Sequence, residues 1–294
     1  MVNDKPPEYL WHYTTAEGLL GIVRSGALRT TDIFYLNDSK EFYGGRDLMV
    51  NHLKTLHSPH PLGNFTYAGL VHWLQGMHTI HPEHMFVASF STESDSLEQW
   101  RAYCPNGGYA IGFPHATLKA MEPNTTYTLH QCVYDLDAQV QAIEEEMGHV
   151  NWYVLGAILS PPPGTAIEGD TNPRLPPSER SLAYKNLLYR VTKLCAILKH
   201  QSFKNESEWR LISAPGVPRD SSGRVEFRID GNIIVPYVSV TLPGTDPWRD
   251  MRIMVGPTPH KDQAESAVRR LLRSKSDHCS NDQVSSSEIP YRYW

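Results

Sequence analysis

Phe86 to Phe113, FVASFSTESDSLEQWRAYCPNGGYAIGF, is the stretch of sequence that decides the fold. Its pattern predicts a strand, a turn, a short helix, a tight turn and a returning strand. Side chains alternate between the two faces of a strand, so Ser89 and Ser91 share one face of the first strand. Trp100 and Tyr103 are three residues apart and therefore lie on the same side of the helix.

Two interpretations of this stretch remain open. In the first, it is a strand–helix–strand element of an ordinary core, with Ser94 or Asp95 capping a helix that carries Glu98 in its first turn. In the second, its small hydroxyls and aromatic rings form the floor and wall of a ligand pocket, because both strand ends converge within a short span.

The composition favours a globular chain of 294 residues with a net charge of −5. We expect a single domain over residues 1–294, since no break in composition divides the chain. Residues 160–177 contain six prolines and predict a loop, which serves as a lid, an insertion or a partner-binding segment.

Several classes of protein are disfavoured by the same composition. No run approaches the roughly 18 apolar residues of a membrane span, and the first residues lack the apolar centre of a signal peptide. The four cysteines are far apart and form no CxxC pair. We therefore expect a cytoplasmic protein with reduced thiols and no membrane partner. The net negative charge disfavours broad binding to a phosphate backbone.

The first elements of the chain are predicted to be strand, helix and strand. Tyr9 to Tyr13 has the pattern of a strand, Thr14 is expected to cap the following helix, and Gly26 has the position of a C-terminal glycine. Ala27 to Thr31 follows as a second strand. His12 then lies at the end of the first strand, where a histidine is either a hydrogen-bonded core residue or a functional one.

A polar segment with two aromatic residues follows. Asn37 or Asp38 is expected to cap a helix that runs to about residue 56. Phe34 and Tyr35 come just before this cap and could line a cleft.

The second informative segment ends with alternating polar and apolar residues. Glu206, Glu208 and Arg210 are expected to share one face of a strand, with Trp209 and Leu211 on the other face. One interpretation is an ion pair between Glu208 and Arg210 on a solvent-facing strand. The other is a carboxylate at the mouth of a sheet, oriented by the neighbouring arginine.

The remaining elements follow from hydrophobic periodicity and turn residues. Helices are predicted at about residues 62–77, 137–155, 178–200 and 262–275, and strands at 126–134, 225–235, 238–242, 252–255 and 289–294, with a hairpin turn at Asp230-Gly231. His78, His81 and His84 are spaced by three, but Pro82 breaks the helix that would align them for zinc. A metal site is therefore not expected.

Combined motifs give a resemblance over nearly the whole chain, from about residue 9 to residue 292. The chain resembles a widespread bacterial family known only as a domain of unknown function. The matching motifs are Trp11-His12-Tyr13-Thr14, Ala27-Leu28-Arg29, Phe34 with Asn37, Asp38 and Glu41, Ser89-Phe90-Ser91, Trp100 with Tyr103, Gly108 to Phe113, Lys199 with Glu206, Glu208, Trp209 and Arg210, Val255-Gly256-Pro257, and Ile289 to Arg292. The sequence departs from the family in having Ser39, where proline is common.

The layout of that family is similar to the ADP-ribosyltransferase fold. The resemblance implies an α+β fold with a split, mixed β-sheet and flanking helices around a site for NAD, which is a substrate. It implies that His12 and Thr14 hold the nicotinamide ribose and that Glu208 bonds a ribose hydroxyl, with Glu206 nearby. Tyr35, Tyr103 and Tyr109 compete for the position stacked on nicotinamide.

The expected function is that of an NAD-dependent ADP-ribosyltransferase, a glycosyl-transferring enzyme that modifies protein or nucleic acid as a bacterial toxin or phage-defence effector. The catalytic candidates are Glu208 and His12. The candidates for binding NAD are Tyr13, Thr14, Tyr35, Asn37, Ser89, Ser91, Trp100, Tyr103, Tyr109, Glu206 and Arg210. A positioned carboxylate suits the positive charge that develops on ribose, and aromatic faces suit the planar leaving group.

Two alternatives come from other functional classes. A ligand-binding or interaction module would use the same site without catalysis. A metal-dependent nuclease would use Glu41, Glu206 and Glu208 around a divalent ion, which the acidic overall charge disfavours.

Overall fold

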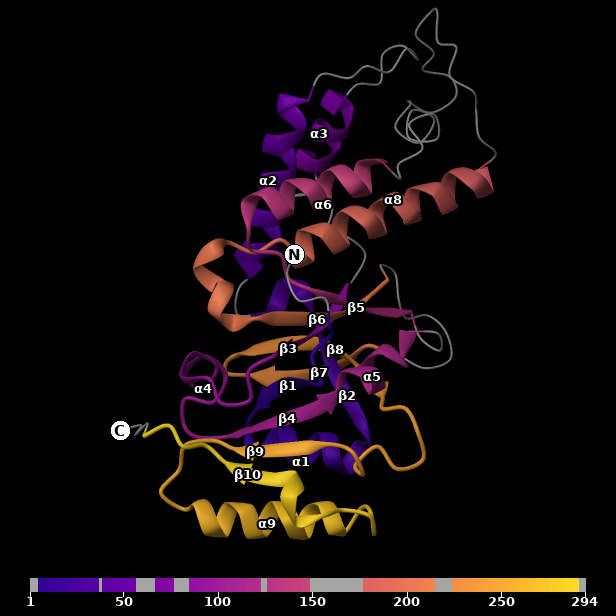
Figure 1. Ribbon diagram of the computed structural model, residues 1–294. Helices are drawn as coiled ribbons and strands as arrows, with labels where there is room; N and C mark the ends of the chain where they lie inside the picture. Colours follow the sequence, from indigo (N-terminus) through magenta and orange to yellow (C-terminus); the bar gives the residue numbers. More distant parts are fainter. Residues whose placement is uncertain are drawn as a thin grey trace, which may run out of the picture.

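Strand β3 (Phe86–Ser91), the first strand predicted in the deciding stretch, lies at the centre of the sheet. The computed structural model describes residues 5–36, 39–56, 67–76, 85–122, 126–148, 177–214 and 224–290 (Figure 1). In these ranges ten strands form one sheet. The other strands are β1 (Tyr9–Thr14), β2 (Ala27–Asp32), β4 (Tyr109–Pro114), β5 (Tyr127–Gln131), β6 (Glu208–Ser213), β7 (Glu226–Asp230), β8 (Ile233–Thr241), β9 (Arg252–Val255) and β10 (Val284–Ser286).

Helices flank this sheet. They are α1 (Ala16–Ser25), α2 (Ser39–Thr55), α3 (Tyr67–Gly76), α4 (Leu97–Tyr103), α5 (His115–Lys119), α6 (Leu136–Gly148), α8 (Pro177–Ile197) and α9 (Lys261–Arg273), with short 3₁₀ turns η1 (Ile33–Tyr35), η3 (Gln201–Glu206) and η4 (Asn281–Gln283). Figure 1 shows α2, α3, α6 and α8 together beyond the β5 and β6 side of the sheet, and α9 at the opposite end. Within the described ranges, no helix combines the length and the apolar character needed to cross a bilayer.

The sheet divides at β3. One edge of β3 pairs with β6 from Val87 to Ser91. The other edge is shared, since β1 pairs with β3 at Ser91 and β2 pairs with it at Phe86 and Val87. One branch continues from β1 through β4 and β9 to β10, and the other from β2 through β8 to β7.

These pairings are antiparallel except for the parallel pair of β9 and β10, so the sheet is mixed. The α+β class, with a mixed sheet and flanking helices, is confirmed. The closer likeness to ADP-ribosyltransferases and the single-domain organisation stay predictions.

Each face of the sheet has its own core. On one face Leu10, Phe90 and Ile111 pack with apolar side chains of α1 and α9. On the other face Val87 and Ile212 pack with α2, α3, α6 and α8. Burial of apolar side chains on both faces explains why β3 has buried residues on its two sides, in contrast to the alternation of a half-exposed strand.

Two predicted helix caps differ from the observed ones. Thr15, and not Thr14, caps α1 by accepting from the Gly18 amide, because Thr14 still belongs to β1 and pairs with Tyr109. Ser96 caps α4 in place of Ser94 or Asp95. The carboxylate of Asp95 instead accepts the indole N–H of Trp100 at 2.7 Å, the Ser287 hydroxyl at 2.6 Å and the Glu288 amide at 3.1 Å.

The C-terminal third contains two further corrections. Residues 238–242 were expected to form a separate strand, but they continue the second strand of the hairpin, so that β8 spans Ile233–Thr241. Among the described residues the last strand is β10 (Val284–Ser286), which ends where Ser287 and Glu288 bond to Asp95. Of the expected strand at 289–294, Ile289 and Pro290 are not in a strand, and residues 291–294 lie outside the described residues. The hairpin turn is confirmed, with Gly231 at φ 57°. The proline-rich loop at 160–176 lies outside the described residues.

Candidate functional site

Glu208 is the first residue of β6, and strand pairing determines its neighbours. Ser91 on β3 lies opposite Glu208, and Trp11 on β1 lies opposite Ser91. Ser207 has a φ of 45°, a conformation uncommon for a residue other than glycine, and it turns the chain from η3 into β6. Glu208 therefore enters the sheet close to the position where β1 and β3 separate.

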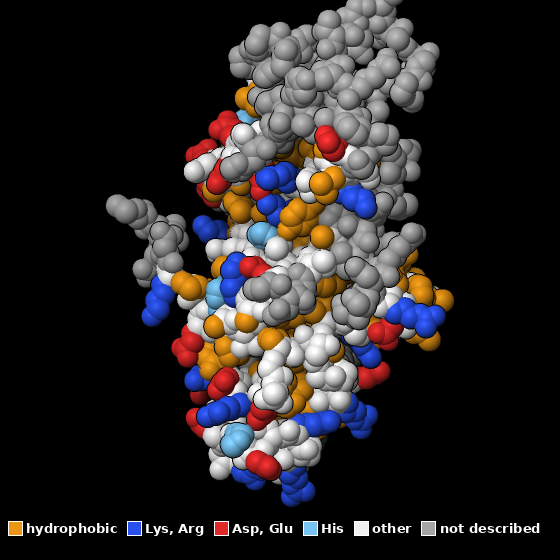
Figure 2. Space-filling model, turned by 90° about the vertical axis from the view of Figure 1, so that its right-hand side faces the viewer, with side chains coloured by type: hydrophobic (Ala, Val, Ile, Leu, Met, Phe, Trp, Pro, Cys, Tyr) orange, Lys and Arg blue, Asp and Glu red, His pale blue; other side chains and the backbone are white. Residues whose placement is uncertain are grey.

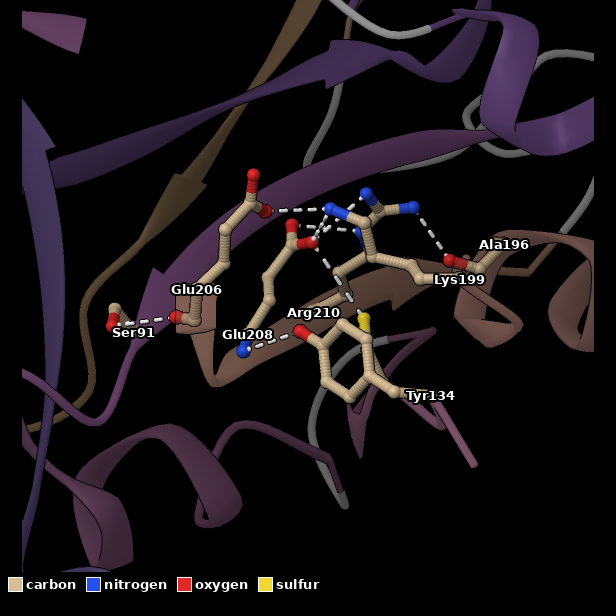
Figure 3. A network of polar contacts seen from close by, with 8 residues as sticks. Ser91, Tyr134, Ala196, Lys199, Glu206, Glu208 and Arg210 are labelled. Carbon is tan, nitrogen blue, oxygen red and sulfur yellow. Dashed lines mark hydrogen bonds and ion pairs between the residues drawn. The ribbon is translucent and has the colours of Figure 1, made fainter. Parts of the chain in front are cut away.

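The Glu208 carboxylate is the centre of a buried cluster of ion pairs (Figure 3). Its Oε1 accepts from Nε of Arg210 at 2.8 Å, and its Oε2 accepts from Nη2 of Arg210 at 3.0 Å. Nζ of Lys199 donates to the same Oε2 at 2.8 Å. The exposed fractions of Lys199, Glu208 and Arg210 are only 4%, 4% and 5%. Both carboxylate oxygens are therefore occupied by protein cations.

The predicted ion pair between Glu208 and Arg210 is present, but the strand that carries it is buried. The two residues share a face of β6, as the alternation predicted. That face is covered by the helices that pack on Ile212, and Arg210 reaches the end of α8, where Nη1 donates to the Ala196 carbonyl at 2.6 Å. The interpretation as a solvent-facing strand is therefore wrong.

The charges of the cluster fix its protonation state. Burial alone would raise the pKa of Glu208, but Arg210 and Lys199 outweigh burial and lower this pKa to about 2. Burial would likewise lower the pKa of Lys199, but Glu208 outweighs it and raises this pKa above its ordinary value. Glu208 is thus an anion and Lys199 a cation at neutral pH.

Two further contacts hold the cluster in place. The Tyr134 hydroxyl accepts the amide N–H of Glu208 at 2.8 Å. Nε2 of Gln139, on α6, donates to the carbonyls of Lys199 at 2.6 Å and Val133 at 2.7 Å. The position of the ions is therefore set by side chains from α6 and from the segment after β5.

Glu206 is the more accessible carboxylate of the site. Its Oε2 accepts from Nζ of Lys199 at 2.6 Å, and 20% of its side chain is exposed. Its backbone carbonyl accepts the hydroxyl of Ser91 at 2.7 Å, which ties η3 to the end of β3. No hydrogen bond from another described residue reaches its Oε1, which points away from the other labelled residues in Figure 3. Glu206 belongs to η3 and not to the strand that was expected to include it.

The helix α4 brings aromatic rings to the same face of the sheet. Trp100 is fully buried against Tyr13, with ring centroids 4.6 Å apart. Tyr103 is half-buried, and its pKa is raised by burial and then by the nearby charges of Glu208 and Glu206. Of the three competing tyrosines, Tyr103 is therefore the one that the structure places beside the carboxylates.

From β1, the structure brings Tyr13 to the face that carries Glu208. Its hydroxyl donates to the Glu93 carbonyl at 2.8 Å and accepts the Ser96 amide at 3.0 Å. Both bonds fix the turn between β3 and α4. The carbonyl of Thr14, at the end of the strand, accepts from the thiol of Cys104 at 3.3 Å.

His12 faces the other side of the sheet. Its ring contacts Phe90, with centroids 5.8 Å apart, and Phe90 belongs to the core under α1. Nδ1 bonds to the Ser89 carbonyl at 2.9 Å, and burial lowers the pKa of His12. Because adjacent strand residues alternate, Trp11 and not His12 shares the face of Glu208. The structure thus does not bring the two predicted catalytic residues together.

The remaining candidates are scattered. Tyr109 packs on the same core as His12, also away from Glu208. Tyr35 is exposed in η1, which follows the end of β2 paired with Phe86, so it lies about 16 Å along β3 from Ser91. Ser89 pairs with Arg210 across the strands. Asn37 lies outside the described residues.

Residues that the sequence did not single out complete the site. Tyr134, Gln139 and Ala196 bond to the cluster from distant segments, and Lys199 is the cation shared by Glu206 and Glu208. Lys199 occurs in the quoted motif. The sequence did not predict its contact with both carboxylates, because a turn and a 3₁₀ helix separate it from Glu208 along the chain.

The described surface has mixed charge. Figure 2 shows Lys and Arg side chains interspersed with Asp and Glu on the visible face. In the described ranges, no group of three or more His, Cys, Asp or Glu has the geometry to hold a metal ion. His78, His81 and His84 lie outside these ranges, as does the side chain of Glu41.

Comparison with known proteins gives one finding. No curated protein and no solved structure matches the chain. Residues 99–211, which include Trp100, Tyr103, Glu206, Glu208 and Arg210, match the family DUF2971, described as a protein of unknown function. This match confirms the resemblance to a domain-of-unknown-function family over residues 99–211, whereas the motifs predicted a resemblance from about residue 9 to residue 292.

Proposed function

We propose that the protein uses NAD as a substrate and transfers its ADP-ribose group to a macromolecular acceptor. The observation that carries the proposal is the arrangement of Glu206, Glu208 and Tyr103 on one face of the sheet, beside the position where β1 and β3 separate. An anionic group and an aromatic ring at one site suit a planar leaving group bound to a sugar that becomes cationic.

The reaction breaks the bond between C1′ of the ribose and the nicotinamide nitrogen, whose electron pair leaves with nicotinamide. A nucleophilic oxygen or nitrogen of the acceptor forms the new bond to C1′ and loses its proton. A fixed carboxylate lowers the barrier, because its charge is already oriented toward the developing oxocarbenium ion.

The two glutamates have different roles in this proposal. Both oxygens of Glu208 accept from Arg210 and Lys199, so Glu208 acts by fixing Lys199 and the end of β6. Oε1 of Glu206 is the carboxylate oxygen that extends away from these cations and is in a position to meet a ligand. Glu206 is therefore the residue on which we expect nicotinamide release to depend most directly.

The test is nicotinamide release from NAD, with and without a bacterial lysate as the source of acceptors. The variants are Glu206→Gln and, as a matched carboxylate on the same surface, Glu98→Gln on α4. Glu98 is exposed and, among the described residues, its side chain bonds to Asn205 alone, through a 3.3 Å contact from Nδ2. Loss of release in the first variant, with an unchanged melting temperature and an active Glu98→Gln, supports the transferase. Absence of both release and an NAD-induced thermal shift in the wild type contradicts it.

A module that binds a ligand without catalysis is the second candidate. The observation that favours it is that Glu208 is buried and both of its carboxylate oxygens already accept from Arg210 or Lys199, which disfavours a further bond from a ribose hydroxyl. A thermal shift with NAD that is not followed by release, at any lysate concentration, would support the module.

We also propose the biological setting of a toxin or phage-defence effector. Growth arrest on expression of the wild type, relieved by Glu206→Gln at equal protein level, is the expected result. Equal growth of both strains would contradict this setting.

A further inference from the structure

Strand β7 (Glu226–Asp230) forms one edge of the sheet. In the described residues β7 pairs with β8 alone and ends the branch that runs from β2. The side chains of Phe227 and Ile229 are 65% and 80% exposed. Large apolar side chains on an unpaired strand edge are a template for pairing with another strand.

The turn of the hairpin fixes which backbone groups point outward. Gly231 and Asn232 form a two-residue loop closed by the pair Asp230 and Ile233. Such a pair is hydrogen-bonded, and hydrogen-bonded and non-hydrogen-bonded pairs then alternate along the ladder. The N–H and C=O groups of Phe227 and Ile229 therefore point away from β8.

Pro236 agrees with this assignment. It lies opposite Phe227, and a proline has no N–H with which to bond to Phe227 across the hairpin. The free backbone groups of the edge thus belong to Val225, Phe227 and Ile229, and the same three side chains form its apolar face.

The other face of this edge carries charges of alternating sign. Arg224 and Arg228 are positive, and Glu226 and Asp230 are negative. Within one chain Arg228 pairs with Asp230 at 3.1 Å, and Glu226 accepts from the Tyr237 hydroxyl at 3.0 Å. The alternation makes the strand complementary to an antiparallel copy of itself.

We propose that two copies of the chain associate by antiparallel pairing of β7 with β7, centred on Phe227. In this register Phe227 lies opposite Phe227 of the second copy, and Val225 lies opposite Ile229. Glu226 lies opposite Arg228, and Arg224, two residues before the strand, lies opposite Asp230. Each oppositely charged pair occurs twice by symmetry, and each apolar residue meets an apolar residue.

Neighbouring registers that keep the outward groups paired are worse. A shift by two residues in one direction places Glu226 opposite Glu226, and a shift in the other direction places Arg228 opposite Arg228. A shift by four residues keeps Arg228 opposite Asp230 but moves Glu226 opposite Asn232 in the turn, which shortens the ladder. Like charges directly opposite each other destabilise a strand pair, so the register centred on Phe227 is selected.

The experiment measures the dimer dissociation constant of the full-length chain by sedimentation over a concentration series. Charge-reversal variants test the register of the strand pairing. Glu226→Arg and Arg228→Glu each place like charges opposite each other and should raise the dimer dissociation constant about tenfold, since each change acts at two symmetric sites. The double variant restores opposite charges and should recover the affinity. A double variant as weak as the single ones would overturn the register.

An apolar pair of variants tests the edge independently of the charges. Ile229→Lys lies on the edge strand, whereas Ile234→Lys lies opposite it on β8, where the side chain is 66% exposed. Only Ile229→Lys should dissociate the dimer, while the melting temperatures of both variants stay close to each other. Equal dissociation by both variants, or a wild type that is monomeric at every concentration, would overturn the proposal.

Discussion

At the scale of single residues, the charge on Glu208 is the feature that most constrains the site. A carboxylate buried to this degree would ordinarily be neutral, but here Arg210 and Lys199 donate to both of its oxygens. The cluster contains two anions and two cations when Glu206 is included, so its charges balance. Removal of the Glu208 carboxylate leaves the buried Arg210 without its anionic partner.

The first prediction concerns Glu208→Gln. We expect a loss of about 3–5 kcal/mol in the free energy of unfolding at neutral pH, because Arg210 keeps its charge without its carboxylate partner. Urea denaturation measures this loss. Glu206→Gln is the control and should cost less, since Glu206 is more exposed and Arg210 does not depend on it. Equal losses in the two variants would contradict the central place of Glu208.

The second prediction concerns acid. The pKa of Glu208 is lowered from 4.5 to about 2 in the folded protein, so folding favours its ionised form. The stabilisation from Glu208 is therefore complete above pH 4.5 and is lost as the pH falls toward 2. Urea denaturation between neutral pH and pH 3 should show a stability decline in the wild type that is shallower in Glu208→Gln. An equal decline in the free energy of unfolding of the two proteins would show that other carboxylates determine the loss of stability in acid.

At the scale of elements, helix ends and turns follow the local rules of the sequence. Gly26 ends α1 with a φ of 65°, where its amide bonds back to the Ile22 carbonyl at 2.9 Å. A left-handed residue at this position satisfies carbonyls that the last helical turn leaves open. Gly231 has the same kind of conformation in the hairpin that presents β7.

The third prediction compares two glycines that have no atom within 4 Å of an added Cβ. Gly26→Ala should lower the free energy of unfolding by about 1 kcal/mol, because only its positive φ opposes alanine. Gly44→Ala, inside α2, should raise it by roughly 0.5–1 kcal/mol through helix propensity. Thermal denaturation measures both, and a change of the same sign in the two variants would contradict the assignment of the α1 cap.

At the scale of the whole molecule, Asp95 joins the α4 region to the C-terminal segment. Its carboxylate accepts from Trp100 on the adjacent helix α4 and from Ser287 and Glu288, almost two hundred residues later. The segment after β10 is thereby held against the turn that contains Ser96. The amide of Ser96 in turn donates to the hydroxyl of Tyr13 on β1.

The fourth prediction is that Asp95→Asn loosens this segment. The asparagine amide keeps one acceptor oxygen but puts an NH₂ donor in place of the other, so the bond from the Glu288 amide is lost. Hydrogen exchange should become faster in peptides covering residues 284–290. Asp135→Asn is the control, because among the described residues the Asp135 side chain accepts from the nearby Ala138 amide alone, so this change should leave that exchange unchanged. Unchanged exchange in Asp95→Asn would show that other contacts hold the segment.

The sequence by itself determined much of the local structure. Periodicity and turn residues predicted β1, α1, β2, β3, α4 and β4, as well as the hairpin turn, because each depends on neighbours within a few residues. The same alternation predicted that Glu208 and Arg210 share a strand face. The family motifs predicted a resemblance from about residue 9 to residue 292, and the match to a family of unknown function covers residues 99–211 of that range.

Only the tertiary structure decided which faces meet. The pairing of Trp11 with Ser91 determines which side chains of β1 share a face of the sheet with Glu208. This pairing turns His12 to the opposite face and places Tyr13 on the face of Glu208. The reach of Lys199 to both glutamates depends on how α8 ends above β6, which no local pattern encodes. The helices packed on the face of β6 then convert a pair that looked exposed into a buried ion cluster, because burial depends on how helices and sheet pack and not on the strand alone.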